Sequence, residues 1–271
     1  MRKGTMRKKN VLVIVLTVLL LLSAVVLGVS TVYRVNSVSV RASVVSDEAN
    51  AEAEELQTLL TAAYDKQSIF SADDSLAKEI VEKFPYFNVT GFEKKYPNLL
   101  VVEVTEEAEV YALSVDETNT SYYIVSEKGT VLGIRSDYKN RSDNADNLLI
   151  TGLQVTGAKG APIAGDDCIP TLFPFLAKVS SLLEGIRRNI ASVEVLRLAS
   201  SAEETVFKLN TLEGVHIYVR NPSALTEQKA ETAVSEYLSM TTEQRLKGML
   251  LISDSSGEVI YDYNQTDEID P

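Results

Sequence analysis

The sequence is poor in the residues that most often carry metal or thiol chemistry, because its 271 residues include one cysteine and one histidine. A single cysteine, Cys168, cannot form a disulfide within the chain, so the folded parts must be held by hydrophobic burial. We expect Cys168 to be a small buried apolar residue, the alternative being an exposed thiol. One histidine and one cysteine are also too few for a zinc site of nitrogen and sulfur ligands.

Catalytic signatures are missing as well. His216 alternates with Val215 and Ile217 in an expected strand, and we interpret it as an outward-facing structural residue. A Ser-His-Asp triad would have to use this histidine, and no Gly-x-Ser-x-Gly segment supplies its nucleophile. Nor does the chain contain a glycine fingerprint for binding phosphates or dinucleotides.

Adjacent carboxylates are the remaining catalytic candidates: Glu106-Glu107, Asp166-Asp167 and Glu203-Glu204. All three pairs fall at expected strand ends or in loops, where a solvated charge is the ordinary interpretation and a glycosidase pair is the alternative. We therefore predict no catalytic, cofactor-binding or metal-binding residue. The sequence favours a binding or scaffolding protein over an enzyme.

Long apolar runs are also few, and the one at the N-terminus decides the topology. Residues 11–29 carry no formal charge, and at about 1.5 Å per residue they just span a hydrocarbon layer roughly 30 Å thick. Tyr33 and Arg34 follow as an expected interfacial anchor. A cleaved signal sequence is the alternative, but its apolar core would usually be about 7–15 residues. The residues that we assign to the membrane span include Val11, Leu12, Val13, Leu20, Leu21 and Leu27.

The head that precedes this run is basic, and it orients the span. Lys and Arg favour the cytoplasmic flank of a membrane helix, so residues 1–10 are expected inside and the rest of the chain outside, as a single-pass type II protein of the cell membrane. The basic residues of the head are Arg2, Lys3, Arg7, Lys8 and Lys9.

The exported part is strongly acidic. The chain has 26 basic and 38 acidic residues, and removing the five basic residues of the head leaves 21 against 38, a net charge near −17. This sign argues against nucleic acid as a partner, because binding to phosphates needs clustered Lys and Arg. Solubility is the ordinary reason for such a charge.

The pattern beyond the span predicts two modules and an α+β fold. Residues 34–112 give a strand at 35–45, two amphipathic helices, and strands at 86–92 and 99–104, a β-α-α-β-β order. Residues 113–265 give a hairpin at 122–134, a loop at 136–147, a helix at 172–186, three strands, a helix at 226–240 and a final hairpin. We expect the boundary in the polar stretch 112–120 and a frayed acidic tail at 266–271.

Several short segments resemble those of one bacterial family. They are Gln67-Ser68-Ile69-Phe70, Phe84-Pro85-Tyr86-Phe87, the stretch Lys94-Lys95-Tyr96-Pro97-Asn98-Leu99 that leads to Glu106, and the hairpin residues Tyr123 to Gly129. Together with the basic head and single anchor, this order resembles the FtsQ/DivIB family of cell-division proteins over residues 11–265. The family usually has Thr where Leu99 stands and often Pro where Glu109 stands, and we can name no counterpart for the 136–147 loop.

The resemblance implies a fold and a function. It implies a membrane-proximal POTRA module, then a β domain of mixed α/β structure whose extended sheet is open at its C-terminal edge. It implies a non-enzymatic divisome scaffold at the septum, without cofactor, that binds FtsB/DivIC-like and FtsL-like single-pass proteins and helps control septal peptidoglycan synthesis. In this family the partner adds a strand to the open edge. The expected edge residues here are Glu258, Val259, Ile260, Tyr261, Asp262 and Tyr263.

Tyr261 and Tyr263 share one face of that strand, and two interpretations stay open for them. Paired tyrosines suit an interface because they bury a large area at low rotamer cost, but they can equally cover the hydrophobic core. Two other functions also stay open. The first is a membrane-anchored exported cell-wall enzyme or regulator. The second, a secretion or outer-membrane assembly factor, would need repeated modules and a C-terminal barrel that the sequence does not contain.

Overall fold

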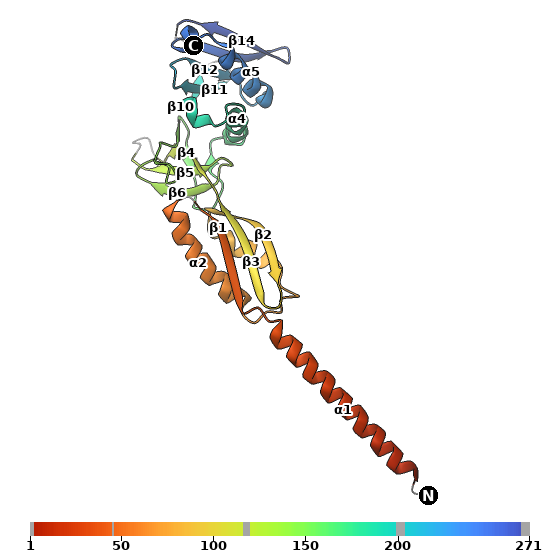
Figure 1. Cartoon of the computed structure of the whole chain (residues 1–271). Helices are drawn as coiled ribbons and strands as arrows, with labels where there is room; N and C mark the ends of the chain where they lie inside the picture. Colours follow the sequence, from red (N-terminus) through yellow and green to blue (C-terminus); the bar gives the residue numbers. More distant parts are fainter. Residues whose placement is uncertain (1–2, 45, 116–119, 199–203, 267–271) are drawn as a thin grey trace. The chain divides into compact units, whose positions relative to one another are not determined.

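The computed structural model of the chain describes residues 3–44, 46–115, 120–198 and 204–266 (Figure 1). The chain divides into two compact units, the N-terminal unit Met1–Glu106 and the C-terminal unit Glu107–Pro271. The sequence analysis put the boundary after residue 112, but that residue lies inside strand β4 (Glu109–Ser114). The division therefore falls before this strand. The predicted acidic tail lies largely outside the described residues.

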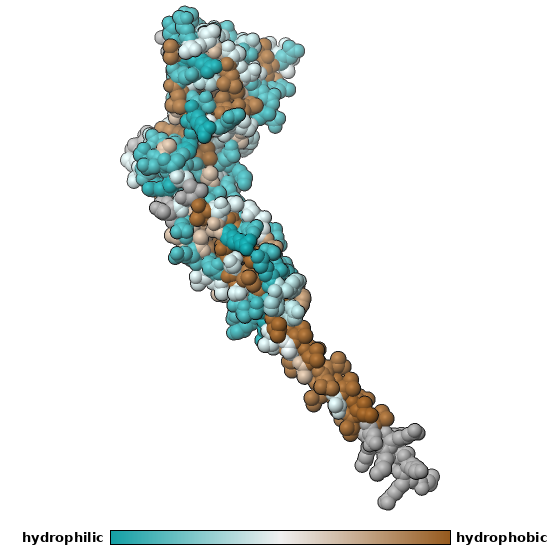
Figure 2. Space-filling view, in the orientation of Figure 1, coloured by the Kyte–Doolittle hydropathy of each residue, from teal (hydrophilic) through white to brown (hydrophobic). Residues whose placement is uncertain are grey.

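The chain begins with helix α1 (Lys3–Val32), which contains the predicted apolar run. Its stretch Val11–Val32 has 22 residues with a mean hydropathy of 3.1, and none of it is buried against the rest of the protein. Figure 2 shows this stretch as a continuous apolar rod. Thr17 and Thr31 donate hydroxyl hydrogen bonds of 2.9 Å to the carbonyls of Val13 and Leu27. The helix is thus long and apolar enough to cross a membrane, with these two hydroxyls satisfied internally.

The rest of the N-terminal unit has the predicted β-α-α-β-β order. Its elements are β1 (Ser37–Ser43), α2 (Asp47–Tyr64), α3 (Ser75–Val81), β2 (Phe87–Lys95) and β3 (Leu99–Glu106). Within the described residues the strands form a three-stranded sheet in the order β1-β3-β2, with β1 parallel and β2 antiparallel to β3. Leu56 and Leu60 of α2 and Leu100 and Val102 of β3 are fully buried, so the helix packs on one face of this sheet.

The outer edge of β1 is covered by a side chain of α2. The amide nitrogen of Gln57 donates to the carbonyl of Val38 at 2.5 Å, and its amide oxygen accepts from the backbone N–H of Val40 at 2.7 Å. One glutamine therefore occupies both kinds of backbone group on this edge strand. An edge covered in this way has fewer unpaired backbone N–H and C=O groups for an additional strand to bind.

The C-terminal unit is built on a large mixed sheet. Its described strands run in the order β14-β13-β12-β11-β10-β7-β4-β5-β6. Besides β4 they are β5 (Tyr122–Ser126), β6 (Val131–Arg135), β7 (Leu148–Thr151), β10 (Ile190–Leu198), β11 (Glu204–Thr211), β12 (His216–Arg220), β13 (Met249–Ser255) and β14 (Glu258–Asn264). The pairs β4/β7, β7/β10 and β12/β13 are parallel, and the other pairs are antiparallel. Strands β8 (Val155–Thr156) and β9 (Ala164–Gly165) form a separate small ladder.

Helices cover one face of this sheet (Figure 1). They are α4 (Ile169–Leu182), followed by the 3₁₀ turn η1 (Ile186–Arg188), then α5 (Thr226–Ser239) and the short α6 (Thr242–Arg245). Phe175 of α4 packs edge to face against Phe207 of β11 with ring centroids 5.5 Å apart, and both residues are fully buried. In α5 the apolar residues Ala230, Ala233, Val234 and Tyr237 face inward, whereas Leu238 is 49% exposed. The hydrophobic core of the unit lies between these helices and the sheet.

Candidate interaction site at the edge of the large sheet

The final hairpin is closed by a tight turn. Ser255 pairs with Glu258, which leaves Ser256 and Gly257 as a two-residue loop. Both loop residues have positive φ, 54° and 83°. This backbone is that of the hairpin turns whose twist matches the right-handed twist of the flanking strands. The turn therefore fixes the register of β14 on β13.

Among the described residues, strand β14 is the terminal strand of the large sheet and is paired along its length with β13. Alternate residues of such a strand direct their backbone N–H and C=O groups away from the sheet. Every residue predicted for the interaction site lies in β14. Glu258 and Asp262 are exposed, and Ile260 is 48% exposed.

The two tyrosines of β14 have different environments. Tyr263 is half-buried and packs against the core, and its hydroxyl lies within hydrogen-bonding distance of the carbonyls of Gln244 and Lys247, at 3.3 and 3.2 Å. Tyr261, two residues earlier on the same face, is 56% exposed. Of the two interpretations left open, covering the core fits Tyr263. The exposed Tyr261 and Ile260 are the apolar side chains that β14 presents to solvent.

A buried ion pair connects the final hairpin to helix α5. The side chain of Lys229 in α5 is fully buried, and its ammonium group donates to the carbonyls of Arg220 and Asn221 at 2.9 and 2.8 Å. It also donates to the carboxylate of Asp254, the β13 residue opposite Val259. This contact ties α5, the end of β12 and the β14 hairpin together. The sequence does not indicate this contact, because one lysine beside Ala230 gives no distinguishing signal in an amphipathic helix.

The opposite edge of the sheet is partly occupied by the chain itself. At the start of β6, Val131 donates to the carbonyl of Ala161 at 2.9 Å and accepts from the N–H of Gly160 at 2.8 Å. Thr130 forms a bridge with Pro162. Ile134, further along β6, is 52% exposed. The two terminal strands thus differ, since the first residues of β6 already have backbone partners from the same chain.

The loop predicted at 136–147 is organised by a buried carboxylate. Glu109 is 3% exposed, and its carboxylate accepts from the guanidinium of Arg135 at 2.8 Å and from the backbone N–H of Arg141 at 3.1 Å. The side-chain amide of Asn140 donates to the Glu109 carbonyl at 2.6 Å and to Asn147 at 2.9 Å. The glutamate that stands where the family often has proline is therefore a structural residue here.

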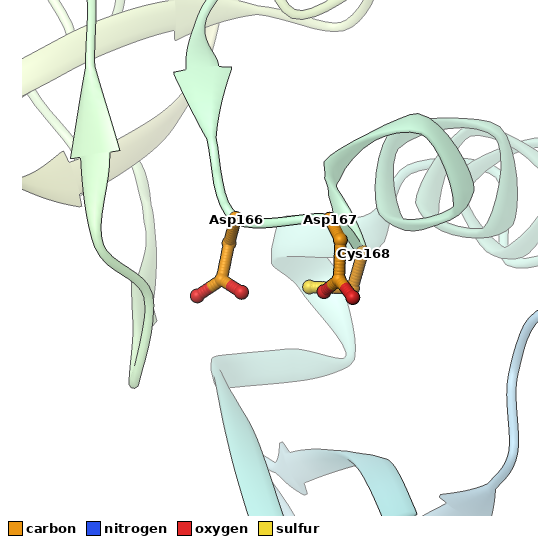
Figure 3. Close-up of side chains that lie close together, drawn as sticks. All are labelled: Asp166, Asp167 and Cys168. Carbon is orange, nitrogen blue, oxygen red and sulfur yellow. The ribbon is translucent and has the colours of Figure 1, made fainter.

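The pair Asp166-Asp167 and the single cysteine lie together at the start of α4 (Figure 3). Arg197 of β10 forms ion pairs with both carboxylates, and Asp166 also accepts from the backbone N–H of Gln154 at 3.3 Å. Cys168 is 7% exposed, as predicted, and burial raises the pKa of its thiol. The thiol is thus protonated, and the two carboxylates are already paired with an arginine. We interpret all three residues as structural.

The other predicted candidates also make structural contacts. His216 begins β12 on the face away from the core, with its ring centroid 6.5 Å from that of Tyr218. Glu203 lies outside the described residues. The remaining carboxylates of the predicted pairs are held by Ser46 (Glu106), Lys128 (Glu107) and Arg220 (Glu204).

No protein-family model matches the chain, and no curated protein matches it significantly.

Proposed function

We propose that this chain is a membrane-anchored, non-enzymatic scaffold of the bacterial divisome, of the FtsQ/DivIB kind, and that it binds FtsB/DivIC-like and FtsL-like proteins at the septum. The observation that carries the proposal is the exposed terminal strand β14 with Ile260 and Tyr261 at its surface. The β-α-α-β-β order before the large sheet supports a POTRA module, which the resemblance in sequence implies. An enzyme would be the alternative, but the paired carboxylates that could serve it form structural contacts wherever the structure describes them.

A retained anchor fits α1 better than a cleaved signal sequence. The helix continues to Val32, and Tyr33 still donates its backbone N–H to the carbonyl of Val29 at 3.0 Å. Val35, two residues later, is already buried in the N-terminal unit. A signal peptidase needs a small-residue site in an accessible segment, and this helix leads directly into folded chain. The basic head then keeps the N-terminus in the cytoplasm and exports both units.

The β14 edge is suited to strand addition for two reasons. Its backbone groups supply hydrogen bonds to any extended partner, and its exposed Ile260 and Tyr261 supply side-chain contacts that select among partners. Two other edge strands differ from it, because Gln57 covers β1 and residues 160–162 pair at the start of β6. Within the large sheet, a partner strand would therefore be directed to β14 rather than to the start of β6.

The test is a binding measurement with the full-length protein in nanodiscs. The ligands are the extracytoplasmic segments of the FtsB/DivIC-like and FtsL-like proteins of the same cell. We expect the double variant Ile260→Lys, Tyr261→Lys to bind at least tenfold more weakly, because lysines at an edge oppose strand pairing and an interfacial tyrosine is often worth about 2 kcal/mol. Tyr263 is left intact because it supports the fold.

A matched control is available on the opposite edge. Ile134 is as exposed as Ile260 and lies on the other terminal strand, so Ile134→Lys should bind like the wild type. Equal loss in the control and the test variant would contradict the assignment of the site to β14. If neither partner binds the wild-type protein, the proposed function itself is wrong.

A further inference from the structure

Three aromatic rings gather where α1 enters the N-terminal unit. Tyr33 follows the helix, Phe70 lies in the segment after α2, and Tyr96 lies in the turn between β2 and β3. The ring centroid of Tyr33 is 5.0 Å from that of Phe70 and 6.3 Å from that of Tyr96, and the latter two are 5.7 Å apart. Each ring therefore contacts the other two. We call these residues the aromatic cluster.

The cluster is exposed even though its backbone is firmly held. Phe70 is 58% exposed and Tyr96 is 60% exposed. The N–H of Ile69 donates to the carbonyl of Tyr33 at 2.9 Å, and the ammonium of Lys94 donates to the carbonyl of Phe70 at 3.1 Å. These bonds link all three segments, so the rings are presented together. Large apolar side chains grouped on a surface mark a site that another phase or molecule covers.

The position of the cluster identifies what covers it. Tyr33 is the first residue after the apolar stretch Val11–Val32, so it lies where the hydrocarbon layer gives way to headgroups when α1 spans a membrane. Aromatic residues are enriched at this level, where a ring contacts acyl chains and a tyrosine hydroxyl reaches water. Two cations lie beside the cluster: Arg34 is exposed next to Tyr33, and Lys94 donates to the carbonyl of Phe70. Such cations are attracted to lipid phosphates.

We propose that the aromatic cluster inserts into the headgroup region of the outer leaflet and holds the N-terminal unit against the membrane surface. The proposal rests on the retained anchor of the proposed function. The anchor alone fixes one point of the chain at the membrane. Phe70 and Tyr96, which come from two other segments, add two further points and so restrict the tilt of the whole unit.

The absence of tryptophan from the chain allows a direct test. The full-length protein is reconstituted into vesicles of phosphatidylcholine with a minor share of phosphatidylglycerol, with and without acyl chains brominated near the headgroup. Single reporters are Phe70→Trp and Tyr96→Trp, with Thr105→Trp as the control. Thr105 is exposed and lies six residues after the start of β3, about 20 Å along the strand from the cluster.

We expect brominated lipid to reduce the emission of the first two reporters about twofold or more, because bromine quenches only at close range and interfacial rings lie at this depth. The emission of the Thr105→Trp control should be unchanged. Flotation of the same vesicles on a density gradient reports the anchor separately, and circular dichroism verifies folding.

The outcomes separate the two proposals. If the protein floats with the vesicles but neither reporter is quenched, the membrane contact is wrong and the anchor stands. If the protein does not float, both the anchor and the membrane contact are wrong. If the reporters change only after a division partner is added, the cluster binds protein instead of lipid, and the proposal is overturned.

Discussion

The ammonium group of Lys229 and the carboxylate of Asp254 form an ion pair behind the edge strand, with the lysine side chain fully buried. Lys229→Met removes one donor from the carbonyls of Arg220 and Asn221, although the Asn221 carbonyl keeps the backbone N–H of Ala224. Asp254→Asn leaves the buried ammonium without its counter-charge. We expect each variant to lower the free energy of unfolding by about 2–4 kcal/mol. Hydrogen exchange at the amides of β14 should be faster in both single variants, since the contacts of Lys229 hold the hairpin of β13 and β14 in place.

The double variant Lys229→Met, Asp254→Asn is the informative control. Once the charge is gone, the loss of its partner costs little, so the double variant should be less destabilised than the sum of the single variants. Additive losses would mean that the two side chains act independently.

Among the contacts that organise the 136–147 loop, those of the buried Glu109 carboxylate in β4 should be the most sensitive to substitution. Glu109→Gln removes the counter-charge of Arg135, whose side chain is 15% exposed, and we expect a loss of about 3 kcal/mol in thermal or urea unfolding. The comparison is Glu194→Gln, which breaks the surface ion pair with Lys208 and should cost less than about 1 kcal/mol. Similar losses for the two variants would disprove a special role for Glu109.

Alkaline pH should destabilise the C-terminal unit through buried tyrosines. Burial, helped by the hydrogen bond to Glu213, raises the pKa of Tyr237 to about 12, whereas tyrosine in an unfolded chain has a pKa near 10. Between these two values the unfolded chain has released a proton that the folded protein keeps. Stability is therefore fully present below about pH 10 and falls as the pH rises toward about 12.

Burial also raises the pKa of Tyr111. The measurement for both residues is the phenolate absorbance as a function of pH. Tyr237→Phe and Tyr111→Phe should each remove part of the late-titrating amplitude. Tyr237→Phe should also make the alkaline loss of stability less steep, and an unchanged slope would contradict the assignment.

Two glycines with positive φ provide a matched pair of substitutions. Gly152 has a φ of +80°, and an added Cβ would lie 2.1 Å from the carbonyl oxygen of Val195. Gly257 has a φ of +83° but has open space around it. Gly257→Ala should cost about 1 kcal/mol from backbone strain alone. Gly152→Ala should cost clearly more in the same unfolding experiment, because the backbone of β10 must also move. Equal costs would show that the contact is relieved without penalty.

The sequence predicted elements with a regular pattern well. The helix with the stripe from Leu172 and the final hairpin were found because burial on one face leaves a period of 3.6 or 2 residues. Strand β4 was missed because Tyr111, Ala112 and Leu113 are all buried, so the strand does not alternate. Strand β7 was also missed, because it has only four residues and directly follows a polar loop.

The candidate site was predictable only in part. A last strand with apolar and aromatic residues is visible in the sequence, but the different environments of Tyr261 and Tyr263 are not. They depend on the loop after α6, whose carbonyls lie near the hydroxyl of Tyr263. The aromatic cluster likewise joins residues far apart in the chain. Pairings of this kind arise from tertiary contacts, which no local period encodes.

The unequal ends of the large sheet have a consequence for stoichiometry. A sheet whose two edges were both available could join copies head to tail and grow into a filament. Here Val131, the first residue of β6, and Thr130 before it are paired with residues 160–162, whereas among the described residues β14 has a strand partner on one side. Pairing of β14 of one copy with β6 of the next is therefore opposed where β6 begins. If a partner strand binds at β14 as proposed, we expect one such strand for each copy of the chain.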